Sequence, residues 1–221
     1  MDAIEFLQTH LPSLIEGLRV TLQLTFGGAA FALVLALAAG LGRRSRHRWL
    51  RWPANAYVEV FRGTSAMVQL FWFYFALPFF GVSLPALLTG VLVLGLNSGA
   101  YGAEVVRSAI ANVSGGQWEA ARALNLDERR ILFRVILPQA IPMMLPPAGN
   151  LLIELMKNTA LVSLITLSEL TFTAQVQRAA TLDTVPLFAL TLVIYFVVAQ
   201  ILAVGMRSLE RRFTRHRAGR T

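Results

Sequence analysis

The chain has 221 residues, of which 56% are hydrophobic, 14% are charged and none is cysteine. Because a soluble domain carries about 25% charged residues, this composition excludes most cytosolic enzymes, disulfide-stapled secreted domains and cysteine-ligated metal sites. The net charge of +8 comes from 20 basic residues against 12 acidic ones; the basic residues stand apart from the aromatic ones, which argues against nucleic-acid binding and for an integral membrane protein.

Four stretches contain no Asp, Glu, Lys or Arg, and they cover residues 20–42, 63–103, 135–153 and 184–206. A hydrocarbon core about 30 Å thick is crossed by roughly 20 helical residues. The second stretch is therefore long enough for two spans, with a turn between its prolines at 78 and 85. None of the stretches alternates as barrel strands do, which leaves helices. The sequence predicts an all-α integral membrane protein with five spans, at about 18–42, 57–78, 84–108, 139–160 and 185–207.

Arginine gathers on one side of these predicted spans, after the first span, at the start of the second with Arg62, around the loop 112–138 and in the tail. Seventeen of the 20 basic residues lie on that side, so the positive-inside rule places the N-terminus outside and the C-terminus in the cytoplasm. Residues 1–17 are then a periplasmic N-terminal segment, 18–208 form the transmembrane domain, and 209–221 are a basic cytoplasmic tail. We interpret the basic runs as topology determinants that contact anionic lipid headgroups.

The loop 112–138 has the composition of two short helices rather than of a linker. Trp118, Ala121 and Leu124 recur at helical spacing on one face. Asn125 suits a left-handed helix stop, and Asp127 suits the cap of the helix that follows. The apolar face either enters the groove of a partner or packs on the chain's own spans, and the pattern alone leaves both open.

Three acid–base pairs with a spacing of three residues lie within the predicted spans. This spacing puts both side chains on one helix face, and charges at membrane depth are costly unless they are paired or functional. For the two pairs near the cytoplasmic edge we predict structural ion pairs, and for the deeper third pair a substrate pathway shared with nearby amides. The structural pairs are Glu59/Arg62 and Glu104/Arg107, and the pathway residues are Glu154, Lys157, Asn158, Asn97 and Gln69.

The loop contains Glu119-Ala120-Ala121, which is followed along the chain by Asn125, Val135 and Leu137-Pro138. This resembles the signature loop of ABC importer permeases, which has Gly at the Asn125 position and Ile at the Val135 position. Asn tolerates left-handed backbone better than most non-Gly residues. The segments 57–71, 101–107, 116–121 and 157–163 are similar to permeases of the polar amino-acid uptake family, although Ser65 stands where Pro is usual.

The resemblance, which runs from about residue 14 to 205, implies the transmembrane domain of a type I ABC importer in the inner membrane. Its loop would dock on a cytoplasmic ATPase dimer through Gln117, Glu119, Ala120, Ala121, Arg122, Asn125 and Pro138. The chain has no G-x-x-x-x-G-K-[ST] phosphate loop. We therefore expect ATP and Mg²⁺ to be used by the partner, and this chain to be no enzyme and to bind no cofactor or metal.

The resemblance also implies further partners and a substrate class. A second permease copy or a sister permease would complete the pathway, and an external solute-binding protein would contact Glu169 and Arg178. The substrate would be a polar amino acid or a related zwitterion; the stretch 146–177 is reminiscent of permeases for ectoine-type solutes. The alternative is a secondary transporter or channel subunit without an ATPase, but five spans cannot divide into two inverted repeats.

Overall fold

The computed structural model describes residues 3–218, and every regular element within that range is a helix. Residues 1–2 and 219–221, at the ends of the predicted N-terminal segment and basic tail, lie outside the described range. The all-α prediction is therefore confirmed for the part of the chain that the structure describes.

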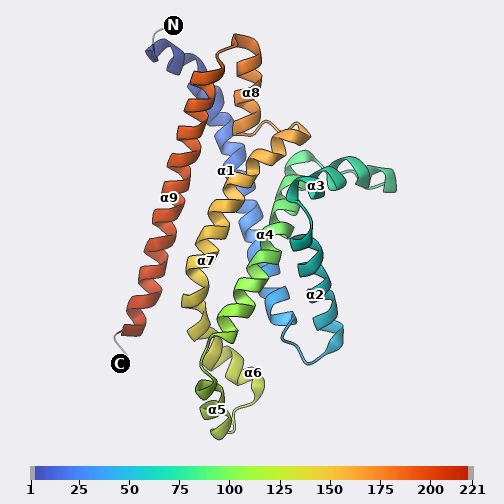
Figure 1. Cartoon of the computed structure of the whole chain (residues 1–221), viewed down its shortest axis with the longest axis vertical. Coiled ribbons are helices and arrows are strands. Elements are labelled where there is room, and N and C mark those ends of the chain that lie inside the picture. The colour runs from blue at the N-terminus through green and yellow to red at the C-terminus, as the bar shows by residue number, and fades with distance from the viewer. Residues whose placement is uncertain (1–2, 219–221) are drawn as a thin grey trace.

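Four of the described helices are long and apolar enough to cross a membrane. A fifth span exists if a helix pair bent by 105° is counted as one. The four are α1 (Ala3–Gly42), α4 (Ala86–Ala111), the continuous run of α6 (Glu128–Arg130), η3 (Ile131–Ile136), α7 (Leu137–Asn158) and η4 (Thr159–Ile165), and α9 (Thr184–Ala218). Figure 1 shows these helices running along the long axis of the molecule.

The predicted second span, 57–78, is wrong as a single straight helix. α2 (Arg48–Gly63) ends before Thr64, and a new helix begins after Ser65 with α3 (Ala66–Phe71), η1 (Trp72–Ala76) and η2 (Leu77–Phe80). Thr64 and Ser65 are extended, with ψ angles of 152° and 135°. Gly63 and Thr64 are poor helix formers, so the helix stops there although the apolar composition continues. The second half runs sideways from the bundle (Figure 1).

Close contact between α1 and α4 forms the centre of the fold. Gly95 and Gly99 of α4 face α1, where an added Cβ would lie 2.7 Å from Phe31 Cδ1 and 2.9 Å from Leu35 Cβ, respectively. Small residues spaced by four allow helix backbones in a membrane to approach closely. The close packing of α4 on α1 therefore depends on glycine, and the Glu104 side chain is carried on the same helix.

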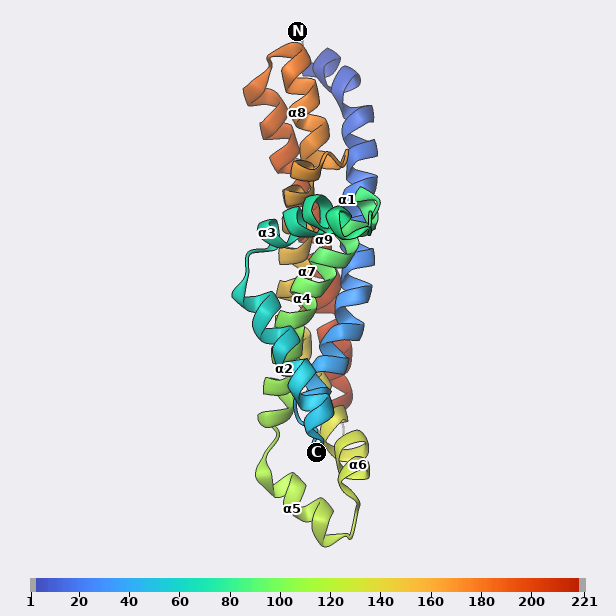
Figure 2. The ribbon, with the colours of Figure 1, turned by 90° about the vertical axis from the view of Figure 1, so that its right-hand side faces the viewer.

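The two ends of the molecule differ in construction (Figures 1 and 2). At one end, α8 (Leu170–Thr181) packs on the first turns of α1 through Leu14, Leu170 and Ala174. From Ala3 on, the segment 1–17 is the beginning of α1 and is continuous with the first span, and its periplasmic location stays a prediction. The opposite end consists of the turn 43–47, α5 (Gly115–Ala123) and α6, and we call it the basic end.

Candidate functional site

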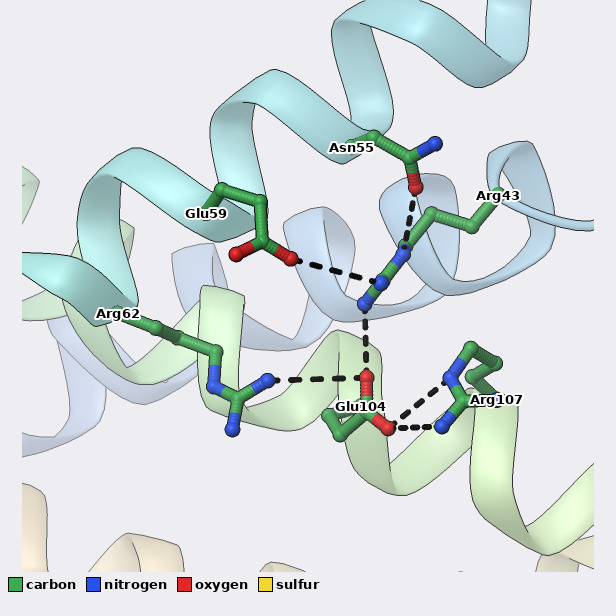
Figure 3. Close-up of polar contacts among 6 residues, drawn as sticks. All are labelled: Arg43, Asn55, Glu59, Arg62, Glu104 and Arg107. Carbon is green, nitrogen blue, oxygen red and sulfur yellow. Dashed lines mark hydrogen bonds and ion pairs between the residues drawn. The ribbon is translucent and has the colours of Figure 1, made fainter.

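A cluster of charged side chains joins the parts of α1, α2 and α4 that lie toward the basic end (Figure 3). Its centre is the carboxylate of Glu104, to which Arg43 Nη1 donates at 2.7 Å and Arg107 Nε at 2.9 Å. Arg62 Nη1 lies 3.7 Å from the same carboxylate, and Arg43 Nε also donates to Asn55 Oδ1 at 2.8 Å. One carboxylate thus holds three guanidinium groups. We call Arg43, Asn55, Arg62, Glu104 and Arg107 the Glu104 cluster.

The structure confirms one of the two predicted structural ion pairs. Glu104 and Arg107 pair within α4. Glu59 and Arg62 do not pair with each other, since Glu59 Oε1 lies 3.9 Å from Arg43 Nη2 and Arg62 reaches Glu104. Glu59 is 75% exposed and Glu104 only 26%. Attraction between charges is stronger where less water surrounds them, so Arg62 binds the more buried acid on the neighbouring helix.

A cavity of about 470 Å³ lies between α2, α4 and α7 beside this cluster. Its wall contains the Arg62 cation and the Glu104 carboxylate, and the Arg62 guanidinium lies 5.4 Å from the centre of the Tyr101 ring. The remaining lining is mixed polar and apolar, with Val105, Ser108, Ala109, Asn112, Met143, Pro147, Asn150 and Leu151. A cation and an anion side by side, with apolar walls around them, match a small zwitterion better than an ion of one sign.

The α7 face that lines this cavity continues as a polar stripe. Asn150 is part of the cavity, and Glu154 and Lys157 follow it at helical spacing. Both charged side chains are exposed, Asn158 is half-buried, and among the described side chains, those of residues 5–213, no ion pair involves Glu154 or Lys157. Their place on the substrate pathway stays a prediction, and unpaired charges on a span require water or a partner surface.

Gln69 and Asn97, also predicted for the pathway, are buried at the break between α2 and α3. Gln69 Nε2 donates to Thr64 Oγ1 at 2.7 Å and to the Phe61 carbonyl at 3.1 Å. Asn97 Nδ2 donates to the same carbonyl at 3.0 Å and to Gln69 Oε1 at 3.3 Å. These amides supply donors to carbonyls that the interrupted helix leaves without one. The structure gives both residues a structural role, and their part in a pathway stays a prediction.

We expect Gln69→Leu to lower the free energy of unfolding by about 2 kcal/mol, because each buried group left without its partner costs about 1–3 kcal/mol. Unfolding of the purified chain in detergent measures this change. Gln200→Leu is the matched control, since Gln200 is exposed on α9 and a surface substitution changes stability by less than about 0.5 kcal/mol. Equal losses in the two variants would contradict the role of Gln69 at the break.

α5 lies at the tip of the basic end, below the long helices (Figure 2). Its inner face packs on the chain itself: Ala121 is buried in a core with Ile131 and Ile136, and Trp118 packs on that core. Leu124, predicted on the same face, is 75% exposed because the helix ends at Ala123. The outer face is exposed and carries Gln117, Glu119, Ala120 and Arg122. Of the two alternatives that the pattern left open, the structure therefore shows the second: the apolar face packs on the chain itself.

The connection from α5 to α7 consists of a short turn followed by the helical segments α6 and η3. Asn125 has a left-handed backbone with φ of 53°, as predicted, and Asp127 Oδ1 accepts a hydrogen bond from the Arg130 N–H at 3.0 Å. The second helix does not end before Pro138, since η3 leads directly into α7. Pro138 is the second residue of α7 and lies inside this continuous helix, directly after the π-helical turns of η3, where the regular backbone hydrogen-bond pattern is already interrupted. The helix that begins at Glu128, directly after the short turn, continues without interruption to the α7 stripe.

Glu169, predicted to contact an external protein, is fully buried instead. Its carboxylate caps α8 by accepting from the N–H groups of Thr171 at 2.9 Å and Phe172 at 2.8 Å, and it accepts from the Tyr195 hydroxyl at 2.9 Å. Burial raises the pKa of Glu169, and the hydrogen bonds oppose that rise. Arg178 is exposed at the same end.

Two residues of the candidate site were not singled out in the sequence analysis. Arg43 was counted only as one of several arginines after the first span, and Tyr101 only as part of a matching segment. The available signal for Arg43 is its position directly after Gly42, where α1 ends. The signal for Tyr101 is its spacing of three from Glu104, which puts both on one face of α4.

Comparison with known proteins adds an independent line of evidence. Residues 28–215 match the model of a family described as binding-protein-dependent transport system inner membrane component. The probable amino-acid ABC transporter permease protein y4tF of Sinorhizobium fredii is 45% identical over 217 residues, covering 96% of this chain and 91% of that protein. The L-cystine transport system permease protein TcyB of Bacillus subtilis is 38% identical over 210 residues, covering 95% of this chain and 90% of that protein.

A solved structure resembles the whole chain. The crystal structure of an amino acid ABC transporter with histidines matches with a TM-score of 0.89 at 35% sequence identity, covering 96% of this chain and 99% of that chain.

Proposed function

Since this chain belongs to the family of binding-protein-dependent transport system inner membrane components, we propose that it carries zwitterionic polar amino acids through the cavity between α2, α4 and α7. The chain is a multi-pass inner membrane protein and the permease subunit of an ABC importer. This membership sets aside the alternative of a secondary transporter or channel subunit without an ATPase. The amino-acid class is supported by two relatives whose names state amino-acid transport.

The observation that carries the substrate class is the loose Arg62–Glu104 contact in the cavity wall. Its separation of 3.7 Å is longer than the contacts of Glu104 with Arg43 and Arg107. A substrate carboxylate is able to replace Glu104 as the partner of Arg62 in a bidentate contact, and a substrate ammonium is then able to bind Glu104. Glu104 keeps two arginines throughout, so the exchange leaves no charge unpaired.

The pathway is completed by a second subunit. The exposed Glu154 and Lys157, with Asn158 beside them, continue the cavity lining along α7, and charges on a span are stable when a polar partner or water covers them. A second copy of this chain or a sister permease supplies that cover, with the two α7 stripes enclosing one passage.

The basic end faces the cytoplasm, because arginines concentrate there and follow the positive-inside rule. A cytoplasmic ATPase dimer docks on the outer face of α5, and it alone binds ATP and Mg²⁺. Closure of that dimer displaces α5, and the continuous helix from α6 transmits the movement to the α7 stripe. At the opposite end, the solute-binding protein delivers substrate near α8, where Arg178 is exposed.

Arg62→Gln tests the cavity. In vesicles holding the permease with its ATPase and binding protein, we expect ATP-driven amino-acid uptake to fall about tenfold or more, because a charge-assisted contact contributes about 1.5–3 kcal/mol. The complex stays assembled, since Glu104 keeps two arginines. Glu59→Gln is the matched control on the same helix, outside the cavity lining, and keeps wild-type uptake. Unchanged uptake by Arg62→Gln would overturn the assignment, and uptake of ectoine but not of amino acids would replace the substrate class.

A further inference from the structure

A second cavity, of about 650 Å³, lies at the basic end between the turn 43–47 and the helices α5, α6 and η3. We propose that it binds an anionic phospholipid, with the phosphate on its basic rim and an acyl chain along its apolar wall. This inference goes beyond the proposed transport function and does not depend on which substrate is carried. We call this space the basic-end cavity.

The rim of the basic-end cavity carries excess positive charge. Arg44, Arg46 and Arg129 line it, and Glu128 is its one acidic lining residue. Glu128 is already neutralised, by Arg46 at 3.5 Å and by Arg122 at 3.1 Å. Within residues 3–218 no ion pair involves Arg44 or Arg129. The rim therefore carries unpaired positive charge, from Arg44 and Arg129, which favours the binding of an anion.

The wall below this rim is apolar, with Ala38, Leu41, Leu50, Leu132 and Phe133. Ala38 and Leu41 belong to the last turns of α1, where the apolar run ends and the arginines begin. The cavity therefore spans the boundary between the hydrocarbon and the headgroup layer. A free phosphate would match the rim but leave the wall uncovered, whereas an anionic phospholipid matches both.

The neighbouring start of α2 marks the same membrane level. Trp49 and Trp52 are 91% and 75% exposed, and Arg48 and Arg51 are exposed in the same two turns. Tryptophan beside arginine is typical of a membrane–water interface. None of these four residues lines the basic-end cavity. We therefore assign the opening of the cavity to headgroup depth, and these four residues provide a control surface with equal charge.

A bound lipid would add to the contacts between the turn 43–47 and the helices α5 and α6. Arg44 lies 5.3 Å from the Trp118 ring centre on α5, and Arg46 pairs with Glu128 on α6. A phosphate between Arg44 and Arg129 adds a charged bridge from the turn to α6. Lipid occupancy therefore holds α5 and α6 against the membrane side of the molecule.

Native mass spectrometry of the full-length chain in a neutral detergent tests the site, with phosphatidylglycerol, phosphatidylcholine and inorganic phosphate as separate probes. We compare Arg44→Gln/Arg129→Gln with the matched control Arg48→Gln/Arg51→Gln. We expect one phosphatidylglycerol per chain in the wild type and the control, and binding at least about tenfold weaker in the cavity variant, because each arginine near anionic lipid contributes a several-fold attraction. Phosphatidylcholine should not be retained.

Three outcomes would overturn the proposal. Equal loss of lipid in both double variants would show a diffuse basic belt rather than a site. Displacement of the lipid by millimolar inorganic phosphate would show a phosphate site without an acyl-chain contribution. Release of the lipid when the ATPase partner is added would show that the cavity serves the partner. Thermal unfolding of both variants without lipid provides the check that each is folded.

Discussion

Replacing Glu119 by Lys should abolish association with the ATPase partner and reduce uptake to less than about one tenth of the wild-type rate. Glu119 lies on the exposed outer face of α5 and takes no part in the core that Ala121 and Trp118 form. Reversing its charge therefore leaves α5 folded. A cation in place of an acid inside an interface costs several kcal/mol through like-charge contacts and unpaired groups. Co-purification of the ATPase with a tagged permease measures the loss, and ATP-driven uptake in vesicles measures its consequence.

Two further variants make the Glu119 result specific. Glu119→Gln keeps the shape of the side chain and removes only its charge, so it should weaken the association less than Glu119→Lys. Glu16→Lys makes the same charge reversal at an exposed position of α1, far from α5, and should leave the association intact. Retained association in Glu119→Lys, or an equal loss in Glu16→Lys, would show that the outer face of α5 is not the docking surface.

Features that depend on a few neighbouring residues were predictable from sequence. Asn125 as a left-handed stop and Asp127 as a cap both follow from local backbone preference, and both are present. The break at Thr64 was not predictable from hydropathy, because an apolar run has the same composition whether its helix is straight or bent. The side chains that stabilise the break, Gln69 and Asn97, come from different helices, so no single segment contains the signal.

The ion pairs of the candidate site were likewise only partly predictable from sequence. A spacing of three residues correctly paired Glu104 with Arg107 but wrongly paired Glu59 with Arg62. The competing partner of Arg62 lies on another helix and is better shielded from water, a property that only packing determines. The prediction that Glu169 contacts an external protein was wrong for a related reason. Glu is not among the preferred N-cap residues, so its capping role was not expected. Its burial against α1 and Tyr195 results from the way α8 packs on them.

Glu104→Gln should lower the free energy of unfolding by about 3 kcal/mol. Removing one partner of a buried ion pair costs about 3–5 kcal/mol, and the 26% exposure of the Glu104 side chain places the expected effect at the lower end. The variant leaves Arg43, Arg62 and Arg107 close together without their shared counter-charge. Unfolding in detergent measures the change. Glu59→Gln is the control, since an exposed ion pair contributes at most about 1 kcal/mol, and equal effects of the two substitutions would contradict a central role for Glu104.

A double variant separates electrostatic repulsion from loss of packing. Among the ion pairs and hydrogen bonds of the described residues, Arg107 contacts only Glu104, so Arg107→Gln alone removes one contact and leaves Glu104 with two arginines. If repulsion among three arginines destabilises Glu104→Gln, adding Arg107→Gln relieves part of it, and the double variant is more stable than the sum of the single losses predicts. Strictly additive losses would mean that Glu104 acts through packing alone, and the zwitterion exchange with Arg62 would then lose its electrostatic basis.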